Sequence, residues 1–309
     1  MKHILITGGS GFIGRNLCNH FINNSKITVL DNNISSGKEN IIDFIDKDNF
    51  NFVQDNLLNI NKINIGKIDF IYNLACPASP VWYQKHPNQT IKTCTEGIYE
   101  LIDFAKKNDS KIFHASTSEV YGDPLIPVQD ENYFGNVNSF GPRSCYDEGK
   151  RCAEAIFYSN KNEIKYFIGR IFNTYGPYMA KDDGRVVSNF INQAINNEDI
   201  TIYGKGSQTR SFCYIDDMIN FLKILPFSDS EIDVPFNIGN NKEMTILELA
   251  QLIIYISNSK SKIIFLDFPE NDPKIRRPKL NRIKNEFNWE AEVELKEGLE
   301  KTIKYFKGL

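Results

Sequence analysis

The sequence predicts an α/β protein with a Rossmann-type doubly wound parallel sheet and a smaller C-terminal α/β lobe that binds the substrate. In the first half, short apolar runs alternate with helical patterns, which is typical of βαβ units. These runs are mostly apolar and do not alternate with polar residues, as expected of strands that are buried on both faces. A glycine-rich turn directly follows the first run. The 309 residues suffice for one large domain or for two lobes.

Each expected strand of the first half is a short apolar run, and the runs are His3–Thr7, Ile27–Leu30, Phe50–Val53, Phe70–Leu74, Ile112–Ser116 and Tyr166–Phe172. Apolar residues at helical spacing predict a helix over Thr90–Lys107. The pattern loosens after Gly176-Pro177. There it predicts a helix near Val186–Ile195, strands at Thr201–Tyr203 and Phe212–Ile215, and a helix from Asp216.

Two helices are expected near the C-terminus. Thr245 and Glu248 have the spacing of a capping box, which opens a helix that continues through Ile254. Leu295, Leu299, Ile303 and Phe306 predict an amphipathic helix at the end of the chain.

Composition argues against several classes of partner. The net charge of −3 disfavours nucleic acid, and the basic cluster Lys274–Lys279 is short and interrupted by Pro278. No stretch approaches the about 18 apolar residues of a membrane span, and no signal peptide precedes the first strand. The six cysteines and four histidines are scattered, which predicts no metal site. We therefore expect a cytoplasmic protein in a reducing compartment.

The glycine-rich turn predicts a dinucleotide site. Gly8, Gly11 and Gly14 are spaced three apart between a strand and a helix, where glycine lets the backbone approach a pyrophosphate at the helix N-terminus. The next strand ends in Asp31, which can accept hydrogen bonds from the adenosine ribose and would repel a 2′-phosphate. NAD is therefore favoured over NADP. We assign the cofactor contacts to Gly8, Gly11, Phe12, Ile13, Gly14, Asp31, Asn32, Asp55, Asn56, Leu74, Tyr146 and Lys150.

A second motif indicates general base chemistry. Tyr146 and Lys150 lie four residues apart in a helical pattern, so their side chains share one face. An ammonium group near the phenol would lower the tyrosine pKa and allow Tyr146 to act as a base. The polar run Ser116–Gly122 ends a predicted parallel strand, where ligands of open α/β sheets bind.

Together these motifs resemble the extended short-chain dehydrogenases/reductases. Longer runs resemble the UDP-glucuronate decarboxylases (UDP-xylose synthases) within that group, nearly from end to end of the chain. These runs are Leu74–Pro80, Ser116–Pro124, Gly141–Arg151, Arg170–Pro177, Asp183–Phe190 and Gly206–Phe212. One position departs from the family, because Tyr178 stands where an arginine usually follows Gly-Pro. That departure puts the affinity for substrate in question.

The resemblance implies a redox-neutral decarboxylation with NAD. Tyr146 would take the proton of the sugar C4 hydroxyl while hydride leaves C4 for NAD, and the resulting 4-keto uronate would lose CO₂. Protonation at C5 and return of the hydride would then give UDP-xylose. The catalytic residues implied are Tyr146, Lys150, Thr117, Ser118, Glu119 and Arg276, and the substrate contacts are Pro77, Ser79, Tyr83, Asn173, Arg185, Tyr203, Gln208 and Arg210.

The resemblance also implies an organisation in two lobes. Residues 1–175 would form the NAD-binding Rossmann domain, to which segment 212–238 is expected to return, and residues 176–309 would mainly bind the UDP-sugar. A homodimer is expected, with the helices at Thr90–Lys107 and Tyr146–Asn160 packed against their twins.

Three alternative functions stay open at this stage. A sugar-nucleotide 4,6-dehydratase needs an acid for the leaving hydroxyl, and many of these enzymes have Asp-Glu where this chain has Ser118-Glu119. A 4-epimerase generally lacks that glutamate. A non-catalytic NAD-binding scaffold would tend to lose the Tyr146–Lys150 pair, which is present here.

Overall fold

The computed structural model describes residues 1–181, 183–267 and 275–308. Lys274, at one end of the predicted basic cluster, lies outside this part of the chain. Among the described residues, seven strands form one sheet in the order β11-β6-β5-β4-β1-β2-β3, and all neighbouring strands are parallel. The strands are β1 (His3–Thr7), β2 (Lys26–Asp31), β3 (Phe50–Gln54), β4 (Phe70–Asn73), β5 (Lys111–Thr117), β6 (Tyr166–Ile171) and β11 (Phe236–Ile238). The predicted fold class and the six predicted strands are confirmed.

The direction of winding reverses beside β1. The chain proceeds outward from β1 through β2 to β3, then crosses to β4 on the other side of β1 and continues through β5 to β6. At this switch point Thr7 pairs with Leu30 on one side and with Asn73 on the other. Ligands of doubly wound sheets bind outside the carboxyl ends of the strands at such a point.

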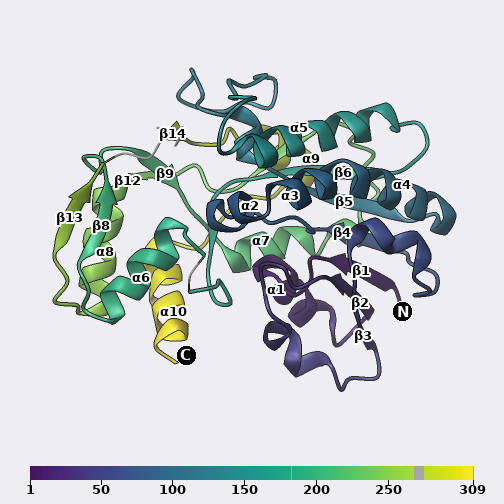
Figure 1. Cartoon of the computed structure of the whole chain (residues 1–309), viewed down its shortest axis with the longest axis horizontal. Helices are drawn as coiled ribbons and strands as arrows, with labels where there is room; N and C mark the ends of the chain where they lie inside the picture. Colours follow the sequence, from purple (N-terminus) through teal and green to yellow (C-terminus); the bar gives the residue numbers. More distant parts are fainter. Residues whose placement is uncertain (182, 268–274, 309) are drawn as a thin grey trace.

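Helices cover both faces of the sheet (Figure 1). In β1, Ile4 and Ile6 belong to the apolar cluster that contains α1 (Phe12–Phe21) and α7 (Ile215–Leu222). Leu5 belongs instead to the cluster of α4 (Glu96–Asn108) and α5 (Ser144–Ser159). Successive side chains of a strand point to opposite faces, so a strand between two helical layers must be apolar throughout.

The predicted helix over Thr90–Lys107 is in fact two helices. α3 (Pro87–Cys94) ends before Thr95, and α4 begins after it. Thr95 has the non-helical angles φ −119° and ψ −81°, and its hydroxyl donates to the carbonyl of Ile91 at 2.8 Å. Such a local bond competes with the helical hydrogen-bond pattern. The apolar spacing continues across the break, which is why it is invisible in the sequence.

The C-terminal half forms a second layered unit, on the left in Figure 1. Its elements are α6 (Val186–Ile195), β8 (Ile200–Tyr203), β9 (Thr209–Ser211), β12 (Glu243–Thr245), α8 (Ile246–Ser257), β13 (Ile263–Leu266), β14 (Ile275–Arg276) and α10 (Leu295–Lys307). The predicted capping box is confirmed, since Glu248 donates its N–H to the Thr245 hydroxyl at 3.1 Å and accepts the Thr245 N–H at 2.8 Å. The predicted helices at Val186–Ile195 and at the C-terminus are also confirmed.

The remaining elements connect the two units. Segment 212–238 contains β10 (Cys213–Tyr214), which pairs with β7 (Thr174–Tyr175), then α7 against the main sheet, and β11 beside β6. α2 (Pro80–Lys85) precedes α3, and α9 (Asn281–Phe287) packs near β11. No helix in the described part of the chain has the length and apolar character needed to cross a membrane.

Candidate active site

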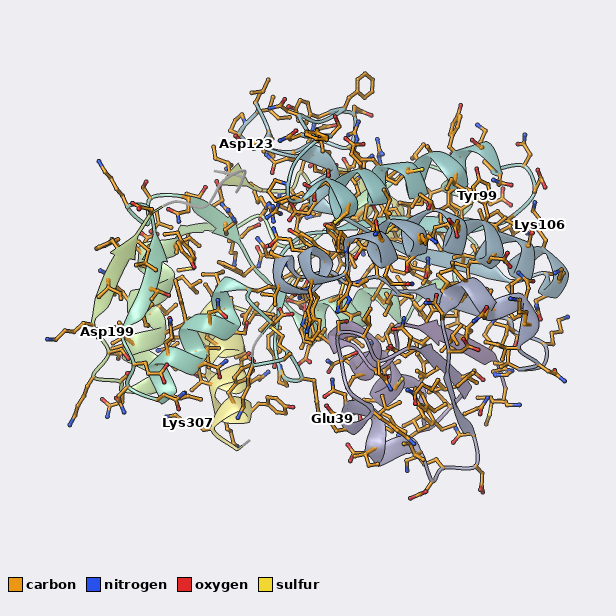
Figure 2. The ribbon with its side chains drawn as sticks, in the orientation of Figure 1. Glu39, Tyr99, Lys106, Asp123, Asp199 and Lys307 are labelled. Atoms are coloured by element: carbon orange, nitrogen blue, oxygen red, sulfur yellow. The ribbon has the colours of Figure 1, made fainter. Side chains whose placement is uncertain are left out.

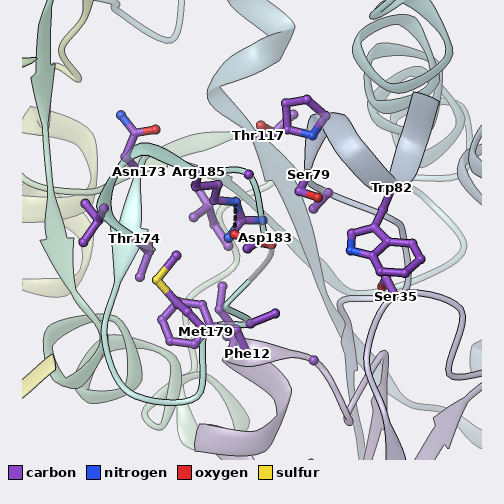
Figure 3. Close-up of a pocket in the computed structure, with 18 of the residues that line it drawn as sticks. Phe12, Ser35, Ser79, Trp82, Thr117, Asn173, Thr174, Met179, Asp183 and Arg185 are labelled. Carbon is purple, nitrogen blue, oxygen red and sulfur yellow. Dashed lines mark ion pairs between the residues drawn. The ribbon is translucent and has the colours of Figure 1, made fainter. Parts of the chain in front are cut away.

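A cleft of about 1160 Å³ lies at the carboxyl ends of the parallel strands, and residues of both units line it. This volume exceeds the about 300–1,000 Å³ that is usual for a single small-molecule pocket. Figure 3 shows Asn173 and Thr174 on one wall, Ser79 and Trp82 on the opposite wall, and the Arg185–Asp183 ion pair between them. The volume therefore suits two ligands that bind side by side.

The glycine turn at one end of the cleft fits a pyrophosphate. Gly8 has φ +71°, and a Cβ atom there would lie 2.7 Å from the carbonyl carbon of Leu74. At Gly14 a Cβ atom would lie 2.6 Å from the Cα atom of Gly9. Side chains are thus excluded where α1 begins, and the first N–H groups of this helix, together with its positive dipole end, can face an anion. Gly8, Gly11, Phe12, Ile13 and Gly14 all line the cleft.

Asp31 ends β2 in the position expected for a ribose contact. Its carboxylate accepts the N–H of Ser10 at 3.0 Å and the N–H of Asn33 at 2.9 Å. Burial raises the pKa of Asp31, although these hydrogen bonds act in the opposite direction. A smaller cavity beside the glycine turn is lined by Asp31, Asn32, Asp55, Asn56 and Leu74, among others. Every predicted cofactor contact therefore lines one of the two cavities.

The predicted catalytic groups meet beside this turn, and all six line the cleft. Tyr146 is 5% exposed, and its phenol hydrogen-bonds with Thr117. The ring of Tyr83 stacks on the Tyr146 ring with centroids 5.0 Å apart. Lys150, one turn further along α5, donates its ammonium to the carbonyl of Ala115 at 2.7 Å, and its Nζ lies 6.0 Å from the centre of the Tyr146 ring.

The effect of this environment on the Tyr146 pKa differs from the sequence prediction. Burial raises the pKa well above its usual value, whereas the Thr117 hydrogen bond and the charge of Arg185 act in the opposite direction. Lys150 shares a helical face with Tyr146, as predicted, but its ammonium is directed to a backbone carbonyl. Desolvation disfavours the phenolate more strongly than these neighbours favour it. The predicted lowering of the Tyr146 pKa is therefore wrong, because burial dominates it.

Glu119 lies between two arginines from distant parts of the chain. Its Oε2 atom accepts from Nη2 of Arg276 at 2.5 Å and from Nη2 of Arg143 at 2.6 Å. Burial raises the pKa of Glu119, but the charges of Arg276 and Arg143 outweigh it, so that the pKa lies below its usual value. Glu119 is therefore a carboxylate at neutral pH, and it holds both guanidinium groups at the cleft.

Two residues of this cluster, Arg143 and Asp147, were not predicted from the sequence to belong to the site. Arg143 lines the cleft, and Asp147, one turn further along α5, lies 3.7 Å from the Arg143 Nε atom. The Oδ1 atom of Asp147 is buried and has no hydrogen-bond partner among the described residues. Burial and the charge of Glu119 raise the Asp147 pKa to about 7. The i, i+4 spacing of Arg143 and Asp147 was a usable signal, but only the fold brings Glu119 to them.

The predicted substrate contacts fall into three groups. Six of them line the large cleft: Ser79, Asn173, Arg185, Tyr203, Gln208 and Arg210. Pro77 lines the smaller cavity instead. Tyr83 is a buried ring stacked on Tyr146 and is not among the described residues that line either cavity. The Ser79 hydroxyl and the Trp82 indole N–H are buried without a hydrogen-bond partner in the described part of the chain, so a ligand could satisfy both.

Arg276, the last residue of β14, and Arg277, which follows that strand, have different surroundings. Arg276 is 9% exposed and lines the cleft, whereas Arg277 is paired with Glu243 at 3.1 Å. Ile275 and Arg276 form the short strand β14 beside β9.

Tyr178, which replaces the usual arginine of the family, contacts both units. The guanidinium of Arg15 in α1 lies 4.3 Å from the centre of the Tyr178 ring, and Nη2 of Arg15 donates to the Tyr178 hydroxyl at 3.3 Å. On its other side, Tyr178 packs against Tyr305 of α10, with ring centres 4.8 Å apart. The same Arg15 nitrogen also pairs with Asp43 at 2.7 Å.

Comparison with known proteins places the chain in a family. Residues 4–239 match the NAD dependent epimerase/dehydratase family. UDP-glucuronic acid decarboxylase 1 of Danio rerio is 45% identical over 308 residues, which are 99% of this chain and 72% of the relative. UDP-glucuronic acid decarboxylase 3 of Arabidopsis thaliana is 44% identical, over 96% of this chain and 86% of that protein. The chain belongs to the UDP-glucuronic acid decarboxylase family.

Solved structures of other members of the wider superfamily have the same fold as this decarboxylase family member. UDP-glucuronic acid 4-epimerase from Bacillus cereus, solved with UDP-glucuronic acid and NAD, has a TM-score of 0.87 and 26% identity, and the match covers 99% of each chain. UDP-glucose 4-epimerase from Thermotoga maritima, solved with UDP-glucose, has a TM-score of 0.90 and 25% identity over 99% of each chain. The predicted family, enzyme class and cofactor are confirmed.

Proposed function

We propose that this chain converts UDP-glucuronate to UDP-xylose and CO₂ with bound NAD and without net redox change. The observation that carries this proposal is the pair of guanidinium groups, Arg276 and Arg143, held by Glu119 beside Tyr146. Arginine presents a planar fork of donors that suits a carboxylate. A uronate whose C4 faces Tyr146 would place its own carboxylate near this cluster.

The residues of the chain then have distinct roles. Tyr146 accepts the proton of the C4 hydroxyl, and Thr117, its hydrogen-bond partner, holds the C4 oxygen together with Ser118. The glycine turn, Asp31 and Lys150 would hold NAD, which when bound would supply the hydride acceptor for C4 and the donor for its return. Arg276 binds the carboxylate that departs as CO₂, and Glu119 orients Arg276 and the sugar.

The ionised state of Glu119 argues against a 4,6-dehydratase. Elimination of water requires an acid that protonates the leaving hydroxyl. Glu119 has a lowered pKa because two arginines contact it, and Ser118 is a poor proton donor. The Tyr146–Lys150 pair argues equally against a scaffold without activity. A 4-epimerase would also accept a UDP-uronate, so product analysis must separate these two activities.

We expect the purified protein to release one CO₂ for each UDP-xylose formed from UDP-glucuronate, with no accumulation of NADH. The reason is that the hydride leaves and returns to the same carbon. Mass spectrometry of the nucleotide sugars, with absorbance at the NADH band, measures both quantities. A UDP-uronate of unchanged mass would indicate an epimerase, and steady NADH release or a 4-keto-6-deoxy sugar would also refute the proposal.

We expect NAD to bind at least about tenfold more tightly than NADP, which corresponds to about 1.4 kcal/mol. The buried carboxylate of Asp31 would repel a 2′-phosphate, and its neighbours Asn32 and Asn33 carry no positive charge. Calorimetric titration of the apoprotein with each nucleotide measures the ratio. Equal affinities would show that Asp31 does not contact the ribose.

We also propose an organisation for the whole molecule. Residues 1–175, with segment 212–238, would hold NAD, and the rest of 176–309 would mainly hold the UDP-sugar.

A homodimer through α4 and α5 is supported by two exposed rings. The side chains of Tyr99 and Tyr158 are 55% and 66% exposed, and Tyr99 lies on the outer side of the helical layer (Figure 2). Light scattering can test for a species of twice 35.5 kDa.

A cytoplasmic location is supported by the six cysteines, all of which are free thiols.

A further inference from the structure

Two cysteines lie within reach of one another at the edge of the cofactor site. Cys76 follows β4, and Cys94 is the last residue of α3. Their Sγ atoms are 3.4 Å apart, and both are free thiols. A disulfide bond has a length of about 2.05 Å, so the two sulfurs, 3.4 Å apart, would have to approach by about 1.4 Å to form one.

Each member of the pair touches a different part of the catalytic machinery. Cys76 lines both the large cleft and the smaller cavity, beside Leu74 and Gly8. Cys94 is 2% exposed and packs against α5, where a Cβ atom on Gly149 would lie 3.4 Å from its sulfur. Gly149 immediately precedes Lys150. The pair therefore connects the loop after β4 with the helix that carries the Tyr146–Lys150 motif.

We propose that Cys76 and Cys94 form a peroxide-sensitive dithiol, whose reversible oxidation to a disulfide weakens cofactor binding and switches the enzyme off. This site is independent of which nucleotide sugar is the substrate. It requires only that the cofactor occupies the cavities that Cys76 lines. The oxidant is hydrogen peroxide, which is small enough to enter the cleft.

The chemistry takes place in two balanced steps. Cys76 lines the cleft whereas Cys94 is buried, so Cys76 is the member of the pair nearer to entering peroxide. Its sulfur attacks peroxide, an S–O bond forms, the O–O bond breaks, and the departing hydroxide takes the thiol proton and leaves as water. The Cys94 sulfur then attacks Cys76, forming the S–S bond and releasing the hydroxyl group, which leaves as a second water with the Cys94 proton. Two thiols are oxidised by two electrons in total, and one peroxide is reduced.

The surroundings of the two thiols affect the two steps differently. The contact between the two sulfurs and the charge of Lys150 lower the pKa of Cys94, whereas burial acts in the opposite direction. The same contact, together with burial, raises the pKa of Cys76. The first step should therefore be slow at neutral pH and faster as the pH rises.

The experiment uses the holoenzyme with and without hydrogen peroxide, followed by removal of the peroxide. We expect non-reducing peptide mapping to find a Cys76–Cys94 disulfide, at least a tenfold loss of turnover, and increased release of NAD on gel filtration. Dithiothreitol should restore all three properties. NAD release and peptide mapping do not depend on the proposed decarboxylation, so they test the dithiol even if the substrate is a different one.

Two variants provide matched controls. Cys94→Ala should keep its turnover and its NAD after peroxide treatment, because no disulfide can form. Cys152→Ala, which removes the exposed thiol of α5, should stay as sensitive as the unmodified protein. Equal inactivation of Cys94→Ala and the unmodified protein would overturn the proposal. So would a mapped disulfide that leaves NAD binding and turnover unchanged, and this second test stands even if Cys94→Ala fails to fold.

Discussion

Replacement of Tyr146 by phenylalanine is expected to reduce turnover by about a hundredfold or more, because the general base for the C4 hydroxyl is lost. The fold and NAD binding should persist. Only the hydroxyl is removed, and the ring can still stack on Tyr83 at the same 5.0 Å separation. The hydroxyl of Thr117 would still accept the N–H of Glu119 at 3.2 Å. The loss should therefore appear in kcat rather than in the stability of the protein.

Single-turnover absorbance of bound NADH measures the oxidation step directly, and thermal unfolding checks the fold. Tyr255→Phe provides a matched control, because Tyr255 is 75% exposed on α8 and away from the cleft. It should keep normal turnover. Near-normal turnover in Tyr146→Phe would mean that another group takes the C4 proton.

The fold could be predicted to a large extent because the strands of the sheet are buried on both faces. A residue such as Leu5 has no solvent-facing alternative, so the central strands appear in the sequence as mostly apolar runs, whereas the edge strand β3 contains the exposed Asn51. The break at Thr95 could not be predicted in this way. The helices on either side of it, α3 and α4, keep the apolar spacing of a single helix.

The site was predictable where its residues are close in the sequence, and less so elsewhere. The i, i+4 spacing placed Tyr146 and Lys150 on one helical face, but the pKa of Tyr146 is dominated by burial, which a local pattern does not report. The ion pairs of Glu119 depend on the fold in the same way. Arg276 is 157 positions away from Glu119 in the sequence and reaches it only because β14 pairs with β9.

Removal of the Arg276 side chain should slow the formation of UDP-xylose by at least about a hundredfold, since hydrogen bonds to charged groups contribute about 1.5–3 kcal/mol each and Arg276 can form two with a carboxylate. We expect Arg276→Ala to retain NAD, because Arg276 lines the cleft from the second unit, whereas the glycine turn lies in the first. Arg276→Lys should recover little, because a single ammonium cannot reproduce the bidentate contact.

The pH dependence of Arg276→Ala provides a second readout. The charge of Arg276 helps to hold the pKa of Glu119 below its usual value. Its loss should raise that pKa, so that Glu119 becomes protonated at a higher pH. If the ionised Glu119 is required, the acidic limb of the pH–rate profile of Arg276→Ala should move upward. A merely structural role of Arg276 would lower the rate without moving this limb.

Arg277→Ala is the control that tests the assignment to within one residue. Arg277 is paired with Glu243, and its side chain is 41% exposed, so its loss should leave turnover close to normal. If Arg277→Ala abolishes turnover while Arg276→Ala does not, the carboxylate contact has been assigned to the wrong neighbour. If neither change matters, the substrate carboxylate must bind elsewhere, and Arg143, which reaches the same Glu119 oxygen from α5, would be the residue to replace next.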